Sequence, residues 1–332
     1  MNTTAYAPGI VGGRREDLRN VLTILEPEET PFTSMVRKGP APKSTFIETL
    51  GDNLKKPTNK GSKEGTDTKR GGNKATSRQR FGTYIHRWMD DYGVSDVQQI
   101  ISERGGQAAV DDEYGFAKAK TLREGKRSIE ATNLGNQDHN GGDDVEMTTR
   151  GAMQWCNPSA QASNPVPSLF RTLPGAVISG VGNPAAFTED QLNNALISLK
   201  GVYGGKRTYQ IIGGNQVVNN IDHFSRTDTG GNTRYKVNEM ADEHEITMMV
   251  SVFDSSFGRA EVQTSDFINI DTSGNPDPNS GLILNIELWH MDLFDALHAM
   301  DLPDLGGGPS GYAKVMWALL CDSPRGNGKI TP

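Results

Sequence analysis

The chain has 332 residues, of which 35% are hydrophobic and 38 are glycines, and its formal net charge at pH 7 is −7. It contains no run of about 18 apolar residues, which excludes an apolar membrane-spanning helix. It also lacks a charged-then-apolar start of the secretory type, so we expect folding in the cytoplasm. Cys156 and Cys321 stand far apart without a C-x-x-C motif and indicate two buried thiols rather than a zinc site or a disulfide framework.

The N-terminal part predicts an extended arm, a short helix and a long hairpin. Residues 1–15 are small and glycine-rich, as in an arm, and the apolar spacing of residues 17–24 predicts a helix that ends before Pro27. Ser44–Leu50 and Gln79–Trp88 are strand candidates on either side of a polar stretch. Together they predict a β-hairpin. Because an isolated two-stranded ribbon is marginally stable in water, it needs another surface to lie on.

The segment from Arg37 to Arg80 is strongly basic. It contains twelve Lys or Arg and four Asp or Glu, a charge of +8, so the rest of the chain carries −15. Between Leu54 and Phe81 it has almost no large apolar residues, and its composition cannot bury enough surface to offset its chain entropy. Its partner is either nucleic acid or an acidic neighbouring copy. The second is favoured, since complementary patches suit identical copies and few aromatic residues are available for base stacking.

Residues 97–134 predict a long helix that a pair of glycines interrupts. Acidic residues open its second part and basic residues follow, an order that complements the helix dipole. Lys120–Glu124 and Lys126–Glu130 have the spacing of i,i+4 ion pairs. The apolar stripe is narrow, so we expect the helix to pack one side on its own sheet and to expose the rest.

The second half of the chain alternates helices and strands. Thr188 and Gln191 form a capping box ahead of a helix that ends near residue 203. A helix is expected at Asn215–Phe224, and strands at Thr208–Ile212, Ile246–Phe253, Arg259–Thr264, Leu282–Trp289 and Tyr312–Leu320. Helices and antiparallel strands fall in separate blocks, which predicts the α+β fold class.

The search for catalytic or cofactor motifs is negative. Gly201–Arg207 fails the phosphate-loop pattern at both ends and predicts a basic helix end. His290, Asp292, Asp295 and His298 have the content of a metal site, but their spacing favours structural or solvated side chains.

His139 lies among Asp138, Asp143 and Asp144, yet the spacing is not that of an EF-hand loop, and a polar turn is favoured. The sequence therefore predicts no enzyme, no metal and no cofactor.

Four short motifs, together with the order of the parts, carry a resemblance. They are Gly13-Arg14-Arg15-Glu16-Asp17-Leu18, Glu29-Thr30-Pro31-Phe32, Tyr92-Gly93-Val94-Ser95-Asp96-Val97-Gln98 and Lys126-Arg127-Ser128-Ile129-Glu130. Over most of its length the chain resembles the HK97-type major capsid (major head) proteins of tailed bacteriophages.

This resemblance implies an α+β HK97-type capsid fold. Its parts would be an N-terminal arm (1–39), an extended E-loop hairpin (40–90), a P-domain (91–184) with a spine helix at about 97–135, an A-domain (185–290), and C-terminal strands (291–332) that return to the core. The implied function is self-assembly into the icosahedral head that encloses the double-stranded DNA genome. The protein would be assembled in the host cytoplasm and reside in the virion.

The site residues that the resemblance implies are contacts between subunits rather than catalysts. In the N-arm they are Arg14, Arg15, Glu16 and Asp17; in the E-loop they are Lys55, Lys56, Lys60, Lys63, Lys69, Arg70 and Lys74; on the spine helix they are Asp111, Asp112, Glu113, Arg123, Lys126 and Arg127. The implied partners are copies of the chain as pentamers and hexamers, a separate scaffolding protein, a portal, decoration proteins and packaged DNA contacted without sequence preference.

Two departures from relatives shape these expectations. The signature begins by residue 13, which leaves no room for a scaffolding extension, so a separate scaffolding protein is expected. Nothing singles out a cross-linking lysine, so no covalent cross-links are expected. The alternatives are an encapsulin-like compartment shell, a nucleic-acid-binding protein that uses residues 55–80, and an enzyme that uses His290 and Asp292.

Overall fold

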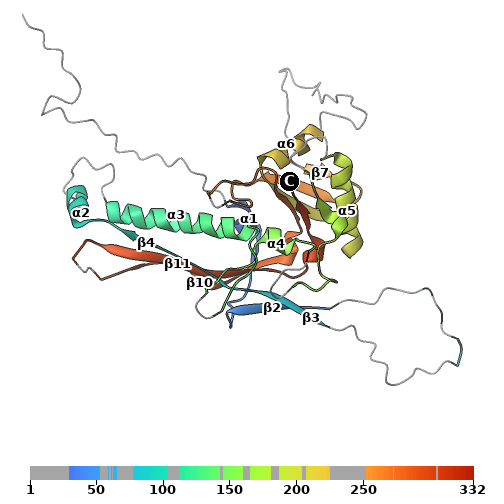
Figure 1. The fold of residues 1–332 in the computed structure, drawn as a ribbon, viewed down its shortest axis with the longest axis horizontal. Helices are drawn as coiled ribbons and strands as arrows, with labels where there is room; N and C mark the ends of the chain where they lie inside the picture. Colours follow the sequence, from blue (N-terminus) through green and yellow to red (C-terminus); the bar gives the residue numbers. More distant parts are fainter. Residues whose placement is uncertain are drawn as a thin grey trace, which may run out of the picture. The chain divides into compact units, whose positions relative to one another are not determined.

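The computed structural model describes residues 30–52, 59, 61, 63–65, 78–103, 112–142, 145–159, 165–180, 187–203, 207–224, 252–271, 273–303 and 306–332. The helix expected at 17–24 and most of the strand expected at 246–253 lie outside these residues. The described residues form two compact units (Figure 1). The small unit holds those within 89–124 and 298–313, and the large unit holds those within 28–88, 125–297 and 314–332.

The α-helices are α1 (Pro31–Met35), α2 (Asp96–Glu103), α3 (Glu113–Leu134), α4 (Ala152–Trp155), α5 (Glu189–Tyr203) and α6 (Asn215–Phe224). Short 3-10 turns are η1 (Pro174–Ala176), η2 (Ile286–Leu288) and η3 (Pro324–Gly326). The strands are β1 (Arg37–Lys38), β2 (Phe46–Gly51), β3 (Gln79–Tyr84), β4 (His86–Gly93), β5 (Val177–Ile178), β6 (Thr208–Gly213), β7 (Val252–Asp254), β8 (Arg259–Thr264), β9 (Gly281–Leu284), β10 (Trp289–Asp301), β11 (Ser310–Cys321) and β12 (Gly328–Ile330).

The described strands form a six-stranded sheet in the order β5-β12-β9-β6-β8-β7, a four-stranded sheet in the order β1-β10-β11-β4, and the separate pair β2-β3. In the six-stranded sheet β6 runs antiparallel to β9 but parallel to β8. The expectation of purely antiparallel strands is therefore wrong at this pair, and also where β1 meets β10 and β5 meets β12. Parallel neighbours need a crossover connection, which the chain between β6 and β8, including α6, provides.

Helices α5 and α6 pack on the six-stranded sheet in the large unit (Figure 1). Leu192, Leu196 and Leu199 follow the helical spacing of one stripe and are fully buried with Tyr209 and Ile211 of β6. Helix α5 begins where the capping box predicts. The Gln191 N–H lies 3.4 Å from the hydroxyl oxygen of Thr188, as such a cap requires.

A second core of the large unit is built around three fully buried tryptophans. Their indole N–H groups donate to the Leu319 carbonyl oxygen (Trp155, 3.1 Å), the Asn327 side-chain oxygen (Trp289, 3.0 Å) and the Asn133 side-chain oxygen (Trp317, 2.9 Å). Each ring thus contributes apolar burial while its one polar group remains paired.

Two predicted strands are divided in the structure. Gln79–Trp88 separates at Ile85 into β3, which pairs with β2, and β4, which joins a different sheet. Leu282–Trp289 ends at Leu284, because the side chain of Asn327 accepts the next backbone N–H, that of Asn285, at 2.9 Å and so interrupts the ladder.

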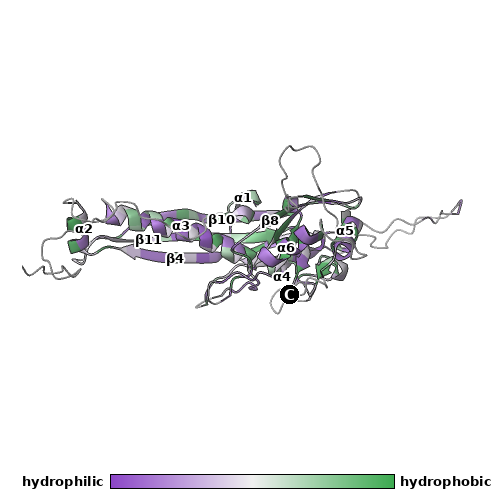
Figure 2. Cartoon of the chain, turned by 90° about the horizontal axis from the view of Figure 1, so that it is seen from above, coloured by the Kyte–Doolittle hydropathy of each residue, from purple (hydrophilic) through white to green (hydrophobic). Residues whose placement is uncertain are grey.

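Other expectations are confirmed. The long helix is present as α2 and α3, and both cysteines are fully buried free thiols. Figure 2 shows polar residues along much of α3, as the narrow apolar stripe predicts. Among the described residues no helix has the length and apolar character needed to cross a membrane.

In the small unit the Asp301 carboxylate gathers three donors. It accepts hydrogen bonds from the Lys118 ammonium (2.8 Å), the Tyr114 hydroxyl (2.8 Å) and the Tyr92 hydroxyl (3.0 Å). These bonds, that of Lys118 foremost, lower the pKa of Asp301 to about 2. The cluster joins α3 to the ends of β4 and β10.

The imidazole of His86 makes the stability of the large unit depend on pH. The centre of the imidazole ring lies 4.5 Å from that of Trp317 in a tilted arrangement, and burial lowers the pKa of His86 from 6.5 to about 4. The folded state therefore binds fewer protons than the unfolded state, so the stabilisation is present above about pH 6.5 and is lost as pH falls toward 4. The unfolding free energy should fall less between pH 6.5 and pH 4 when His86 is replaced by Phe. The difference from the wild-type protein should be up to about 3 kcal/mol.

Urea unfolding of the unassembled subunit between pH 7 and pH 4 measures this slope. The exposed His223, changed to Gln, is the control and should leave the slope unchanged. An equally steep slope in the His86→Phe variant would contradict the assignment.

Candidate assembly interface

The N-terminal arm joins the large unit at α1, and the carboxylate of Glu130 holds this junction. Glu130 lies near the end of α3 and is fully buried. It accepts the backbone N–H groups of Phe32 and Thr33, both at 2.8 Å, and the Thr33 hydroxyl. First-turn N–H groups have no partner inside their own helix, and Thr30 supplies no side-chain cap, so the distant carboxylate replaces it. Burial raises the pKa of Glu130, and the donated hydrogen bonds oppose that rise.

Asn133, one turn after Glu130, extends the same junction. Its amide nitrogen lies 3.3 Å from the Thr33 hydroxyl, and its oxygen accepts the indole N–H of Trp317. The ring of Phe32 meets Trp289 edge-on at 5.8 Å. This set of residues, called the arm root below, thus ties the first described helix to α3, β10 and β11.

The hairpin of β2 and β3 joins the large unit at a second buried junction. Thr83 of β3 is fully buried, and its hydroxyl oxygen accepts the Arg150 N–H at 2.9 Å. The hydroxyl oxygens of Thr83 and Thr149 lie 3.3 Å apart, and that of Thr149 accepts the N–H of Leu319 at 3.1 Å. Strand β3 is therefore connected through residues 149 and 150 to the central strand β11.

His139 packs against the same hairpin. Phe46 and Tyr84 lie opposite each other in the β2–β3 register, and their rings are 5.9 and 5.6 Å from the imidazole. Burial, reinforced by the charge of Arg150, lowers the pKa of His139 to about 4, so the ring is neutral at pH 7. The expected turn is confirmed for the described residues 136–142, which form no helix or named strand, but His139 within it is only 3% exposed.

Arg150 completes the second junction as a buried cation. Its side chain is fully buried, its Nε donates to the Asp138 carboxylate at 2.7 Å, and its guanidinium lies 4.7 Å from the centre of the Trp155 ring. Burial lowers the pKa of Arg150, and the bond to Asp138 opposes this. The residues Phe46, Thr83, Tyr84, Asp138, His139, Thr149 and Arg150 are called the hairpin root below.

The hairpin itself is anchored on one face. Phe81 is fully buried, with its ring 6.2 Å from Trp155 and 5.4 Å from Phe170. The ion pairs along the strands, Arg80–Glu48 at 3.6 Å and Arg78–Asp52 at 3.5 Å, are exposed. Exposed pairs contribute about 0–1 kcal/mol each, so the aromatic contact and the root, not the charges, hold the described part of the hairpin.

The spine-helix residues take different roles. Asp112 accepts the Gly115 N–H at 3.0 Å and a hydrogen bond from Gln99 at 3.3 Å, and these bonds lower its pKa. Glu113 is the first residue of α3. Arg127 lies 5.7 Å from the centre of the Phe267 ring. Asp111 lies outside the described residues.

Arg123 and Lys126 are exposed on α3, and their contact role stays a prediction. The predicted pair Lys120–Glu124 is confirmed at 3.7 Å. The predicted pair Lys126–Glu130 is wrong, because Glu130 points into the arm root.

Most of the predicted arm and E-loop contacts cannot be compared with the structure. Arg14, Arg15, Glu16, Asp17, Lys55, Lys56, Lys60, Lys69, Arg70 and Lys74 lie outside the described residues. Lys63 is described and is exposed. Their roles therefore stay predictions.

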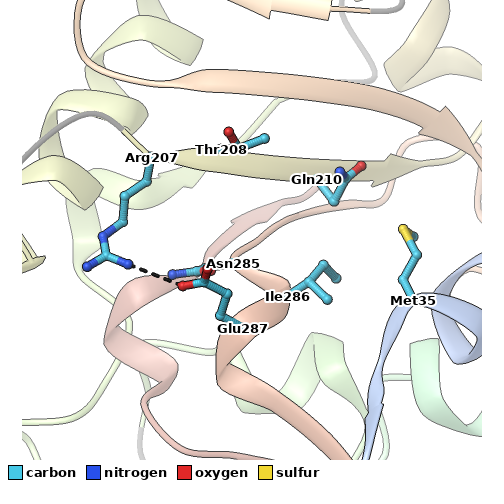
Figure 3. A pocket seen from close by; sticks show the side chains of 7 residues that line it. All are labelled: Met35, Arg207, Thr208, Gln210, Asn285, Ile286 and Glu287. Carbon is cyan, nitrogen blue, oxygen red and sulfur yellow. Dashed lines mark hydrogen bonds and ion pairs between the residues drawn. The ribbon is translucent and has the colours of Figure 1, made fainter.

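A pocket of about 650 Å³ lies in the large unit (Figure 3). Two of its polar side chains pair with carboxylates: Arg207 with Glu287 at 3.4 Å, and Gln210 with Glu261 at 2.6 Å. Met35, Thr208, Asn285 and Ile286 complete the lining. Within the described part of the chain no group of three metal-binding side chains occurs.

Sequence reasoning missed Glu130, His139 and Arg150 as anchoring residues. Local spacing placed Glu130 in an exposed pair and His139 in a turn. The signal that could have identified Arg150 and Asp138 is weak, because two opposite charges twelve residues apart are common in any polar region.

The arrangement defines a class of protein: a subunit with a long helix, a two-stranded hairpin and a sheet domain, in which the arm and the hairpin join the fold at buried polar junctions. The fold is the HK97-type capsid fold. It matches the cyanophage A-1(L) capsid with a TM-score of 0.62 and 13% sequence identity, and the match covers 96% of each chain. It also matches the capsid of an empty GTA particle with a TM-score of 0.57 and 12% identity, over 100% of this chain and 98% of that one. A third match is the SrpI encapsulin of Synechococcus elongatus, with a TM-score of 0.54 and 9% identity over 95% of this chain and 91% of that one. No curated protein sequence matches the chain.

The family description SU10 major capsid protein matches residues 2–332. The chain therefore belongs to the SU10 major capsid protein family, a structural family whose members assemble with copies of themselves into phage capsid shells. The expected function as a head shell protein of the virion is confirmed.

Replacing Glu130 by Gln tests the arm root. The amide keeps one acceptor oxygen but turns an NH₂ group toward buried donors, so the unfolding free energy should fall by about 2–3 kcal/mol. Denaturant unfolding of the unassembled subunit measures this loss.

Glu124→Gln is the matched control, because it makes the same change at a partly exposed position of the same helix and should cost less than about 0.5 kcal/mol. Equal losses in the two variants would show that the buried carboxylate has no special role.

Proposed function

We propose that the chain forms the icosahedral head of a tailed double-stranded DNA phage, with the arm and the E-loop hairpin of each copy holding its neighbours. The observation that carries this proposal is the pair of buried junctions. The arm root and the hairpin root hold α1 and strand β3 on the large unit, at the cost of burying Glu130 and Arg150. Rigid attachment is what an appendage needs if it is to reach a defined place on an adjacent copy.

Charge supports the same assignment. The segment 37–80 carries +8 while the rest of the chain carries −15, so identical copies offer complementary surfaces. An acidic chain also suits a container that touches packaged DNA without binding it tightly. We assign residues 40–90 to the E-loop, 91–184 to the P-domain with α3 as its spine, and 185–290 to the A-domain, which would pack in pentamers and hexamers.

An encapsulin-like compartment is the second candidate, since the fold alone is shared with the Synechococcus elongatus shell. The family match over the whole chain favours a phage head. Neighbouring portal and terminase genes would distinguish the two.

Charge reversal in the E-loop tests the proposed contacts. Changing Lys55, Lys56, Lys60 and Lys63 to Glu should abolish assembly while leaving the melting temperature of the isolated subunit unchanged, because these residues would contact a neighbour rather than their own core. Electron microscopy and light scattering measure the particles. Arg at the same four positions keeps the charge and should restore them. Normal shells from the Glu variant, with salt-dependent DNA affinity lost, would instead support nucleic-acid binding.

We further propose that a separate scaffolding protein, a portal and decoration proteins act with this chain during assembly in the host cytoplasm. Expressed alone, the chain should give subunits, capsomers or irregular particles, because nothing sets the curvature of the shell. Uniform closed shells of one size, seen by microscopy after expression alone, would contradict the need for a scaffolding protein.

A further inference from the structure

Helix α2 of the small unit is inverted with respect to the usual pattern of a surface helix. Val97, Ile100 and Ile101 share one face at i, i+3 and i+4 spacing, and their exposed fractions are 67%, 45% and 50%. Ser102, a polar residue, is only 3% exposed. Figure 2 shows the apolar character of α2. A helix that served only its own subunit would turn its isoleucines inward.

Polar contacts fix the helix in this orientation. Ser95 caps its start, with the Gln98 N–H 3.4 Å from the serine hydroxyl oxygen. The Gln99 oxygen accepts the Tyr114 N–H at 3.2 Å, and its amide nitrogen donates to Asp112. Gln99 thus links α2 to the start of α3 on the side away from the exposed isoleucines. The apolar face is presented outward by specific bonds rather than by loose packing.

We propose that this outer face of α2 is an interface with a second copy of the chain. The inference rests on the proposed function, because in a shell each subunit is surrounded by identical copies. Met300 and Leu302, which are also exposed in the small unit, offer further apolar surface to a copy.

Charge favours another copy over nucleic acid. The exposed Asp96 opens α2, and Asp112 and Glu113 lie at the start of α3, so the surroundings repel phosphate. Further along α3 the small unit carries the exposed basic residues Lys120 and Arg123. Two copies that meet face to face and antiparallel, each through α2, can therefore bring the acidic end of one against the basic end of the other around an apolar centre.

A cysteine at position 100 tests the interface directly. Both native cysteines are fully buried, so the new thiol in Ile100→Cys dominates labelling by a maleimide. Its labelling rate should fall by about tenfold or more from free subunits to assembled particles, because the core of an interface excludes the reagent. Ser273→Cys, in an exposed turn of the large unit, controls for access of the reagent to particles and should label at a similar rate in both forms. Val97→Cys serves as a second probe should the first variant assemble poorly.

Each outcome decides the inference. Slow labelling in particles, with a cross-linked product of twice the chain mass from a short bis-maleimide, supports it. Fast labelling of the Ile100→Cys variant in intact particles overturns it and leaves the proposed function standing, and so does cross-linking to a different protein. Slow labelling already in free subunits also overturns it, because the chain itself would then cover the face. Failure of the wild-type protein to form any particle under all conditions would contradict the proposed function itself.

An Ile100→Lys variant gives an independent measure. It should prevent particle formation without lowering the melting temperature of the isolated subunit, because position 100 is exposed there. Particles that form normally from this variant would overturn the inference.

Discussion

The buried carboxylate of Glu130 is the contact on which the arrangement of the large unit depends. It belongs to α3, but the groups that it satisfies belong to α1, 98 residues earlier in the chain. Without it, the buried N–H of Phe32 and the partly buried N–H of Thr33 would lose their partner, and Phe32 would lose its place against Trp289. The side chain of Glu130 thus fixes the position of α1 on the large unit and the direction in which the chain enters the tryptophan core.

The hairpin root fixes strand β3 on the large unit, as the arm root fixes α1, but through a different set of polar groups. The fully buried Arg150 forms an ion pair with the partly buried Asp138, and the Trp155 ring lies against the guanidinium. Breaking a buried pair by removing one partner is costly, whereas the pair as a whole contributes little net stability. Its value lies in specificity, because only one placement of β3 satisfies Thr83, Thr149 and Arg150 together. Subunits that must present an appendage at a defined place need that kind of constraint.

The subunit has surface features that are expected of a component of an assembly rather than of a monomeric protein. Helix α2 exposes isoleucines while a serine is buried. These features make little physical sense for a protein that works alone, since exposed apolar area is costly in water. They become consistent when identical copies cover them, which is the condition of a shell.

The sequence alone determined the class of fold, the capping box at Thr188, the two parts of the long helix, the buried cysteines and the resemblance to capsid proteins. These depend on local spacing and on the order of the parts. It did not predict the parallel pairing of β6 and β8, the division of two strands, or the anchoring roles of Glu130, His139 and Arg150. Periodicity shows which residues share a face but not what faces them. The groups that donate to Glu130 lie about a hundred positions earlier in the chain, and only the tertiary structure brings them to the carboxylate.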